Sequence, residues 1–550
     1  MITHTEMTRK KQRRIRKIVL SMAFLLFVTA VTAQTATIYT TTSDGSLGLS
    51  KTTVPVQAGK SSESKKLLFD TSRERQTIEG FGFALTYASC YNLMKMSKTN
   101  RHRFLLQTYS PTEGYGVSYA RIAIGSCDFS SKTYSLCDEK GLEHFALQQD
   151  ETKYIIPVLK EILAINPDMK IIATPWSCPK WMKSFTQNGN IAWSVWQGGY
   201  LNPKYRQTYA DYFVKFIEAM KKQGINIYAV SPQNEPLNGG NTASMKMPWD
   251  DEAKFVKVLA STFKRNNLET KIYVYDHNFN YDDEKKQDNY PIKVYNALGN
   301  DFEGSELVVG SAYHDYGGDP SELSNIHVQK PGKQVIFTEA SLGEWNDGRD
   351  LERGTTNVNS KTHLNEDMER LMIGLLNKYC TAVMYWNLML DNNGAPKLRG
   401  GCQNCYGAVD IDSKNYSKLT YNRHYYVISH ASAVVRPGAV WLSSGKVSGI
   451  ASVAFRNPDG SYAVLMSNNG ASDVEVGVSG QSSAWHVDVK LPAESIVSLL
   501  IPYSGIVSSI NAIEVDNPDD DEYYSIDGKR IAEPVVGQIL IHGGRKIIRY

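Results

Sequence analysis

Residues 202–236 read NPKYRQTYADYFVKFIEAMKKQGINIYAVSPQNEP, and this stretch decides the fold class. Asn202 has the side chain of a helix N-cap, Pro203 suits the first helical position, and Gly224 is a typical helix stop. The apolar face between them consists of Tyr209, Phe213, Phe216, Ile217 and Met220. Residues 226–231 then form a short β-rich run. The stretch therefore predicts an amphipathic helix followed by a strand, the repeating unit of an α/β fold.

The same alternation of helix and β-rich run extends in both directions, over residues 67–427. It contains eight runs: Gln76–Phe83, Val117–Ile124, Met169–Thr174, Asn226–Ser231, Lys271–Tyr275, Leu307–Ala312, Gln334–Thr338 and Ala382–Trp386. Several are nearly continuous apolar segments, as expected of strands that are covered on both faces. Eight such units predict a (β/α)8 TIM barrel with loop insertions. A doubly wound sheet is the alternative, but GFGFALT at 80–86 lacks the spacing of a phosphate-binding loop.

The segments on either side of the predicted barrel do not show this alternation of helices and β-rich runs. Residues 34–66 are rich in Ser and Thr and predict an exposed lead-in, with or without an edge strand. Residues 428–503 contain short, closely spaced strands and predict an appended antiparallel β-sandwich. These strands are Ile450–Phe455, Tyr462–Ser467, Val474–Val478 and Trp485–Leu491. An acidic linker at 504–522 then leads to a C-terminal tail at 523–550.

Residues 1–33 have the pattern of a cleaved signal peptide. A basic region at 9–17 precedes an apolar run of 14 residues, which is too short for a comfortable membrane span, and Val31 and Ala33 place small residues before the cleavage point. An uncleaved anchor is the alternative. A lipid anchor is not expected, because the first cysteine is Cys90. The pattern predicts export to the periplasm, the cell surface or the medium, without a stable membrane anchor.

The composition excludes several classes of protein. The chain has 550 residues with 11% aromatics, so most of it is not disordered. Seven basic residues and one acidic residue lie within 1–33, which leaves 53 basic and 56 acidic residues and argues against nucleic-acid binding. Metalloprotease, esterase and P-loop motifs are not found in the sequence, and we expect no metal or cofactor. Cys402 and Cys405 could form a local disulfide or remain free thiols.

Polar residues that directly follow the strands of such a barrel are the candidates for chemistry. Glu235 follows the fourth run, in SPQNEP, and Glu339 ends the seventh, in IFTEA. Glycoside hydrolysis needs such a pair: one acid protonates the leaving oxygen, and one carboxylate attacks the sugar or activates water. A separation of roughly 5–5.5 Å indicates retention of configuration, and roughly 6.5–9.5 Å indicates inversion.

The chain resembles glycoside hydrolase family 30, the glucosylceramidase-like retaining β-glycosidases, from about residue 76 to residue 503. The resemblance rests on eight motifs in order: QTIEGFGFALTYAS, RIAIGSCDFS, ATPWSCPKWMK, YFVKF…AVSPQNEP, SAYHDY, IFTEAS, YWNLML and GGCQNCYG. It implies that Glu235 is the acid/base and Glu339 the nucleophile. It also implies a (β/α)8 barrel and a β-sandwich to which an N-terminal strand contributes.

Three further residues have roles that suit this chemistry. Arg121 lies in an apolar strand, where burial requires a carboxylate partner, and the resemblance implies that this partner is Glu339. Alternatively, Arg121 forms a structural ion pair with a carboxylate elsewhere in the fold. Asn234 can hydrogen-bond the 2-hydroxyl of the sugar, or it caps a turn. The resemblance implies that Asp128 binds sugar hydroxyls.

Aromatic residues and a histidine complete the expected site. Trp176 and Trp386 follow the third strand and end the eighth, where they could stack on a pyranose or pack as core aromatics. Tyr316 could orient the nucleophile through its hydroxyl. His314, two residues earlier, is a site residue or a packed histidine.

The sequence predicts a retaining β-glycosidase for β-glucosidic bonds, with a β-glucan, glycolipid or oligosaccharide substrate. Some bacterial members of the family act on β-1,6-glucan, and other members act on glucosylceramide, so the resemblance suggests both substrates. GFGFALT departs from the GFGGSFT-like form of the family, and loops 187–199 and 238–249, which would set the leaving group, match no known pattern. The alternatives are a β-xylosidase, β-fucosidase or xylanase, or a non-catalytic glycan-binding protein. Endo- or exo-action and the oligomeric state stay open.

Overall fold

The computed structural model describes residues 34–279, 286–343 and 363–502, and four short C-terminal segments at 523–525, 530–531, 539–542 and 545–548. The predicted signal peptide at 1–33 and the predicted linker at 504–522 lie outside the described residues. The described part of the tail pairs into a small sheet in the order β27-β26-β28-β29. Its strands are Arg530–Ile531, Tyr523–Tyr524, Ile539–His542 and Arg545–Ile548.

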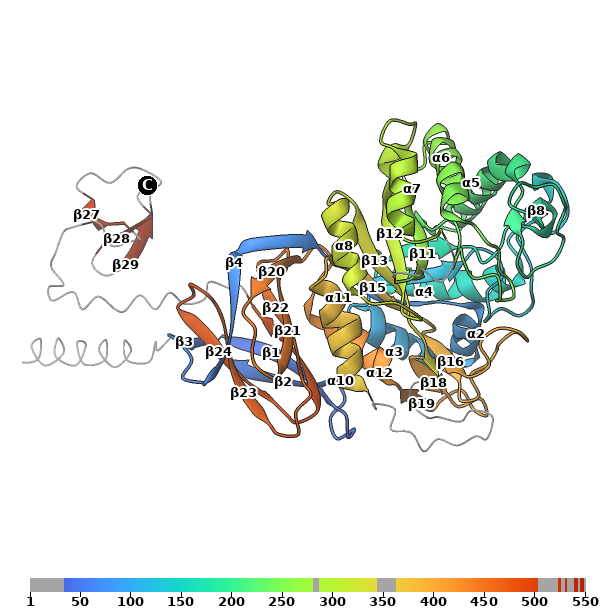
Figure 1. The fold of residues 1–550 in the computed structure, drawn as a ribbon. Coiled ribbons are helices and arrows are strands. Elements are labelled where there is room, and N and C mark those ends of the chain that lie inside the picture. Colours follow the sequence, from blue (N-terminus) through green and yellow to red (C-terminus); the bar gives the residue numbers. More distant parts are fainter. Residues whose placement is uncertain are drawn as a thin grey trace, which may run out of the picture.

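Eight parallel strands close into a barrel in the order β10-β11-β12-β13-β15-β5-β6-β7, which confirms the predicted TIM barrel (Figure 1). In chain order they are β5 (Gly80–Ala84), β6 (Tyr119–Ala123), β7 (Lys170–Thr174), β10 (Ala229–Val230), β11 (Lys271–Asn278), β12 (Val308–His314), β13 (Gln334–Glu339) and β15 (Cys380–Tyr385). Gly82 allows β5 and β6 to approach, because a Cβ there would lie 1.8 Å from the Tyr119 carbonyl oxygen.

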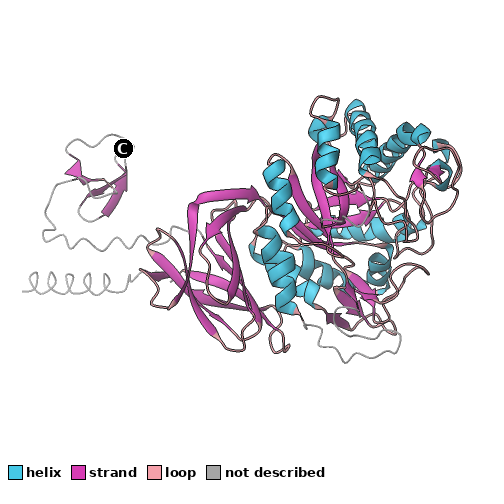
Figure 2. Ribbon diagram, viewed as in Figure 1, coloured by secondary structure: helices cyan, strands magenta, loops and turns pink. Residues whose placement is uncertain are grey.

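Helices surround this barrel, as the cyan ribbons of Figure 2 show. They are α2 (Tyr87–Lys95), α3 (Lys98–Tyr109), α4 (Ile156–Ile165), α5 (Arg206–Lys222), α6 (Trp249–Arg265), α7 (Tyr290–Leu298), α8 (Ser321–Gln329), α10 (Leu364–Asp367), α11 (Gly374–Leu376) and α12 (Arg423–Val434). The predicted cap starts a 3-10 turn at Pro203–Tyr205, which leads directly into α5. Asn202 accepts a hydrogen bond from the Lys204 backbone at 3.2 Å, and the five apolar residues of the predicted face are buried.

A ten-stranded sheet forms the second domain, in the order β2-β1-β25-β22-β21-β20-β4-β23-β24-β3. Its strands are β1 (Thr35–Thr42), β2 (Ser50–Pro55), β3 (Gln57–Ala58), β4 (Lys65–Thr77), β20 (Val440–Ser444), β21 (Ile450–Arg456), β22 (Tyr462–Asn468), β23 (Val474–Gly480), β24 (Trp485–Leu491) and β25 (Ser495–Ile501). The N-terminal lead-in is therefore built into the sandwich, with β1 antiparallel to β25. One pairing departs from the antiparallel prediction, because β23 runs parallel to β4.

The structure moves two of the predicted domain boundaries. Residue 67, predicted to begin the barrel, lies in β4, whose Leu67 and Phe69 are buried in the sandwich core. The barrel strands begin at Gly80 instead. Residue 428, predicted to begin the sandwich, lies inside α12, which is almost entirely buried and packs against both β5 and β25. Because this helix contacts both domains, its sequence alone does not indicate to which domain it belongs.

Short strands outside the two main sheets shape the loops above the barrel. Lys183–Ser184 (β8) pairs with Tyr200–Leu201 (β9), and Leu342–Gly343 (β14) pairs with Cys405–Tyr406 (β17). A three-stranded sheet contains Met389–Asp391 (β16), Val409–Ile411 (β18) and Leu419–Tyr421 (β19). Among the described residues, we find no helix with the length and apolar character needed to cross a membrane.

Candidate active site

A pocket of about 430 Å³ opens where the barrel strands end at their C-terminal side. Six of its lining residues were predicted from the sequence: Asp128, Trp176, Glu235, Tyr316, Glu339 and Trp386. The others were not predicted as site residues: Asn238, Asn241, His277, Asn278, Ser341, Cys402 and Cys405. The predicted residues Arg121, Asn234 and His314 lie directly beneath, within hydrogen-bonding distance of these lining residues or of one another. All nine predicted side chains thus come together in one site.

The two predicted carboxylates face each other across this pocket. One carboxylate oxygen of Glu235, one of Glu339 and a ring nitrogen of His314 lie within 4.8 Å of one another. The nearest oxygens of the two carboxylates are therefore much closer than the roughly 6.5–9.5 Å between the carboxyl groups of an inverting pair, which favours a retaining pair. Glu235 has a left-handed backbone conformation, with φ of 46°, which is uncommon for a residue with a side chain. Its backbone N–H donates to the Asp276 carbonyl at 3.0 Å, which holds this conformation.

Arg121 is completely buried below the carboxylates. Its guanidinium donates to Glu339 at 2.5 Å, to the side-chain oxygen of Asn234 at 2.6 Å and to Asp276 at 2.9 Å. The partner that the resemblance implied, Glu339, is therefore one of two, and the sequence analysis missed the other. Asp276 lies inside β11 with no exposed surface, and it also accepts hydrogen bonds from Ser231 and Thr338.

His314 and Tyr316 connect the two carboxylates. The ring of His314 lies 3.3 Å from Glu235 through Nδ1 and 3.0 Å from Asp276 through Nε2. The Tyr316 hydroxyl donates to Glu339 at 2.9 Å and also lies 2.6 Å from the Ser341 hydroxyl. His314 thus contacts Glu235 directly, and Tyr316 lies where it can orient Glu339.

The surroundings shift the pKa values of the two carboxylates in opposite directions. Burial raises the pKa of Glu235, but the hydrogen bond and charge of His314 and a hydrogen bond from Asn238 outweigh it and hold that pKa at about 2. Burial also raises the pKa of Glu339, and there the opposing charges of His314 and Arg121 do not fully compensate. Burial lowers the pKa of His314, but Glu339, Asp276 and Glu235 raise it to about 9, so the imidazole is charged at neutral pH.

An aromatic wall and one further carboxyl line the pocket opposite these groups. Trp176 and Trp386 lie with their rings 5.3 Å apart, and the Arg121 guanidinium lies 5.0 and 5.6 Å from the two rings. Burial and the charge of Glu339 raise the pKa of Asp128 to about 7. Its Oδ2 accepts from the Cys402 backbone at 3.2 Å, whereas its buried Oδ1 has no hydrogen-bond partner within the described part of the chain. Such an atom needs a partner from outside, such as a hydroxyl group.

Two asparagines from the loop after Glu235 were also missed in the sequence. Asn238 and Asn241 donate to the second carboxylate oxygen of Glu235 at 2.7 and 3.3 Å. Cys402 and Cys405, left open in the sequence, form a disulfide at the rim of the pocket. Glu235, His314 and Glu339 are close enough to ligate a cation. Both ring nitrogens of His314 contact carboxylates, so these groups form a hydrogen-bond network.

Comparisons with known proteins agree with this geometry. The solved structure of an endo-beta1,6-glucanase is 46% identical, with a TM-score of 0.78, and the match covers 85% of this chain and 99% of that chain. Endo-1,6-beta-D-glucanase neg1 of Aspergillus fumigatus is 29% identical over 88% of this chain and 99% of its own length. Lysosomal acid glucosylceramidase of Mus musculus is 26% identical over 77% of this chain and 81% of its own length.

Two family models match the two domains. The glycosyl hydrolase family 30 TIM-barrel domain matches residues 78–435, and the family 30 beta sandwich domain matches residues 438–499. These limits agree with the boundaries that the structure shows, with α12 on the barrel side. The chain therefore belongs to glycosyl hydrolase family 30 and is a glycoside hydrolase.

Proposed function

We propose that this protein is an exported endo-β-1,6-glucanase that cleaves its substrate with retention of configuration. The observation that carries the proposal is the carboxylate pair, held within 4.8 Å at the mouth of the barrel. The 46% identity to an endo-beta1,6-glucanase over nearly all of that chain supports the linkage and the endo-action. The basic and apolar pattern of residues 1–33 supports export, with cleavage after Ala33.

In the first step, Glu339 attacks the anomeric carbon and the glycosidic oxygen leaves with a proton from Glu235. A new bond joins the Glu339 oxygen to the sugar, and the bond to the leaving oxygen breaks. Arg121 and Tyr316 direct the Glu339 carboxylate by hydrogen bonds at 2.5 and 2.9 Å. In the second step, Glu235 takes a proton from water, and the resulting hydroxide equivalent displaces Glu339 from the sugar.

Glu235 needs a source for the proton it delivers, because a pKa of about 2 leaves its carboxyl ionised at neutral pH. His314 is charged and lies 3.3 Å from Glu235. We infer that the proton moves from Nδ1 of His314 to Glu235 as the leaving oxygen gains negative charge. The neutral imidazole keeps its second proton on Nε2, which donates a hydrogen bond to Asp276 at 3.0 Å. After the second step, Glu235 returns the proton taken from water to Nδ1 of His314, which restores the starting state.

The remaining residues bind the sugar next to the cleaved bond. Asn234 turns its side-chain oxygen toward Arg121, so its NH₂ group is the donor for the 2-hydroxyl. The partnerless Oδ1 of Asp128 accepts from another hydroxyl. Trp176 and Trp386 offer aromatic surface to the apolar face of the ring.

Glucosylceramide is the second candidate substrate. Putative glucosylceramidase 2 of Caenorhabditis elegans is 29% identical over 78% of this chain and 82% of its own length, as near as the fungal glucanase. The sugar at the cleaved bond is the same, and only the leaving group differs. The higher identity of the solved glucanase structure places the glucan first.

A product profile tests the proposed function. The protein is incubated in parallel with linear β-1,6-glucan, xylo-oligosaccharides and glucosylceramide, and the products are separated by chromatography. We expect a ladder of β-1,6-linked oligosaccharides at early times and a β-anomer as the first product by proton NMR. Release of glucose alone would contradict endo-action, and an initial α-anomer would contradict double displacement.

A further inference from the structure

Exposed apolar side chains are concentrated in one loop above the barrel. Among the described residues, six large hydrophobic side chains are exposed, and three of them, Phe185, Ile191 and Val195, lie within eleven consecutive positions. The half-buried ring of Trp193 packs against Phe185, with centroids 4.9 Å apart. Single exposed apolar residues are ordinary, but a contiguous group of them marks a surface that binds something.

The loop is fixed in place by a buried lysine. Lys183 is 1% exposed, and its ammonium group donates to three backbone carbonyls: Val195 at 2.9 Å, Trp196 at 3.2 Å and Ser244 at 2.8 Å. Burial lowers the pKa of Lys183 to about 8. All three donors of the ammonium group are therefore used to join this loop to the loop after Glu235.

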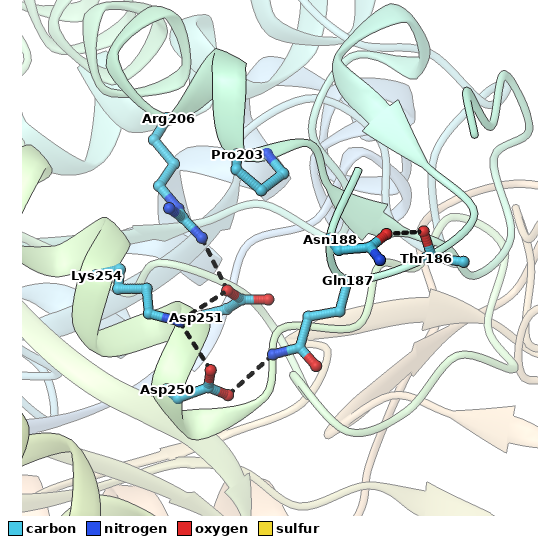
Figure 3. A pocket seen from close by; sticks show the side chains of 8 residues that line it. All are labelled: Thr186, Gln187, Asn188, Pro203, Arg206, Asp250, Asp251 and Lys254. Carbon is cyan, nitrogen blue, oxygen red and sulfur yellow. Dashed lines mark hydrogen bonds and ion pairs between the residues drawn. The ribbon is translucent and has the colours of Figure 1, made fainter. Parts of the chain in front are cut away.

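Figure 3 shows a second attachment of the same loop, at a surface pocket of about 580 Å³. Gln187 donates to Asp250 at the start of α6 at 2.9 Å. The charged groups of this pocket pair with one another, since Arg206 binds Asp251 and Lys254 binds Asp250 at 2.8 and 2.9 Å. The pocket therefore serves to anchor the loop, and its charges are not left free for a ligand.

The loop continues directly into the catalytic centre. Trp196 packs against the cluster that contains Trp176 and Trp386. Its carbonyl oxygen accepts from the Ser244 backbone at 2.9 Å, and Gln197 donates to the Gly240 carbonyl at 2.5 Å. Residues 238–244 are the segment whose asparagines contact the acid/base, Glu235. The Trp196 end of the loop therefore lies beside the segment that contacts Glu235, which delivers the proton to the leaving group, and the Phe185–Trp193 ring pair precedes it in the same loop.

We infer that Phe185, Trp193 and Trp196 form a binding platform for the leaving-group part of a glucan chain, here called the 185–196 platform. The inference rests on the proposed function and extends it from the cleaved bond to the sugars beyond it. Aromatic faces bind the apolar faces of pyranose rings, and rings held by a rigid loop lose little freedom on binding. Continuity with the tryptophan wall of the pocket makes a sugar chain the occupant that fits.

The double variant Phe185→Ala/Trp193→Ala tests the platform, because it removes the exposed ring pair and leaves Trp196 and the catalytic residues in place. We expect kcat/KM on linear β-1,6-glucan to fall about tenfold or more, the effect of one lost anchor residue. We expect kcat/KM on an aryl β-glucoside, whose leaving group is too short to reach the platform, to change less than about twofold. Val328→Ala, at an exposed apolar position on α8, is the matched control and should change neither value.

A binding measurement separates the platform from chemistry. In a Glu339→Gln background, the double variant should bind β-1,6-linked oligosaccharides about tenfold more weakly, while its melting temperature stays unchanged. Equal losses on the polymer and on the aryl glucoside, or no loss on the polymer, would overturn the platform while the proposed function stands. Failure of the wild type itself to cleave β-1,6-glucan would overturn the proposed function, and the platform with it.

Discussion

Both ends of the barrel carry charged residues among the strands, and the two groups are built differently. At the N-terminal end, Glu79 pairs with Lys170 and accepts a hydrogen bond from the Tyr228 hydroxyl, which itself accepts one from Lys271. The side chains of this pair remain 14% and 26% exposed. At the C-terminal end, Arg121 faces two carboxylates with no exposed surface of its own.

From this difference we infer that the N-terminal group serves stability and the C-terminal group serves chemistry. Glu79 and Lys170 balance each other, and the water that still reaches them lowers the cost of their charge. The group at the C-terminal end, here called the upper group, places Arg121 and His314 among three carboxylates: Asp276, Glu235 and Glu339. A proton can therefore move between these side chains while the strands hold their positions. Barrel enzymes carry their active sites at this same end. The following predictions test the contrast, from the largest effect to the smallest.

Glu339→Gln should remove turnover by a factor of at least about 10⁵, because the amide cannot form the covalent intermediate. The variant should melt close to the wild type, since glutamine keeps a side-chain oxygen that accepts from Arg121. Residual activity is measured on an activated aryl β-glucoside. Turnover within tenfold of the wild type would remove Glu339 from the nucleophile role.

Glu235→Ala should lower kcat on the glucan by roughly 10²–10⁴, the range for loss of a general acid. On a substrate with a good leaving group the first step survives, and the intermediate accumulates because its base is missing. Azide should then restore turnover and give a β-glycosyl azide, identified by NMR. If azide rescued Glu339→Ala with that product instead, the two roles would be exchanged.

Arg121→Lys tests the upper group without removing its charge. A lysine cannot contact Glu339, Asn234 and Asp276 at once, so Glu339 loses part of its stabilisation and its pKa, already raised, rises further. A smaller fraction is then ionised at a given pH, and the acidic limb of kcat/KM moves to higher pH. Arg121→Ala should in addition destabilise the fold by about 3–5 kcal/mol, because two buried carboxylates lose their partner. An unchanged acidic limb in Arg121→Lys would show that Arg121 has only a structural role.

The group of Glu79 and Lys170 at the N-terminal end, here called the lower group, should affect stability and leave catalysis nearly unchanged. Burial raises the pKa of Glu79, but hydrogen bonds from Lys170 and Tyr228 outweigh it, so the pKa is lowered. The stabilisation is therefore present above the usual carboxyl pKa of about 4.3 and is lost as the pH falls through the lower folded value. Glu79→Gln should lower the free energy of unfolding by about 1 kcal/mol at pH 7, and the difference from the wild type should shrink below pH 4. Its kcat should stay within twofold of the wild type.

The sequence predicted the parts of the site that follow from local pattern. All eight barrel strands were located, because each is a short apolar run between helical segments. Arg121 was found by the argument that a buried charge needs a partner. Asp276, in the run KIYVYDHN, is a buried charge of the same kind, but it lies inside β11 and not after the strand, so the strand-end pattern does not indicate it.

Other features depend on contacts between distant segments. Strand β1 pairs with β25, more than 450 residues away, and no local pattern indicates that the lead-in completes the sandwich. Asn238 and Asn241 lie in a loop, and only the fold of that loop shows that they contact Glu235. The 185–196 platform depends in the same way on one buried lysine that joins two loops.

Trapping the covalent intermediate tests the central claim most directly. The protein is incubated with an activated 2-deoxy-2-fluoro-β-glucoside, which slows the second step, then digested and mapped by mass spectrometry. The account predicts one fluoroglucosyl group per molecule, on the peptide that contains Glu339, and loss of activity in proportion to labelling. A label on Glu235, or full inactivation without a label on Glu339, would contradict it.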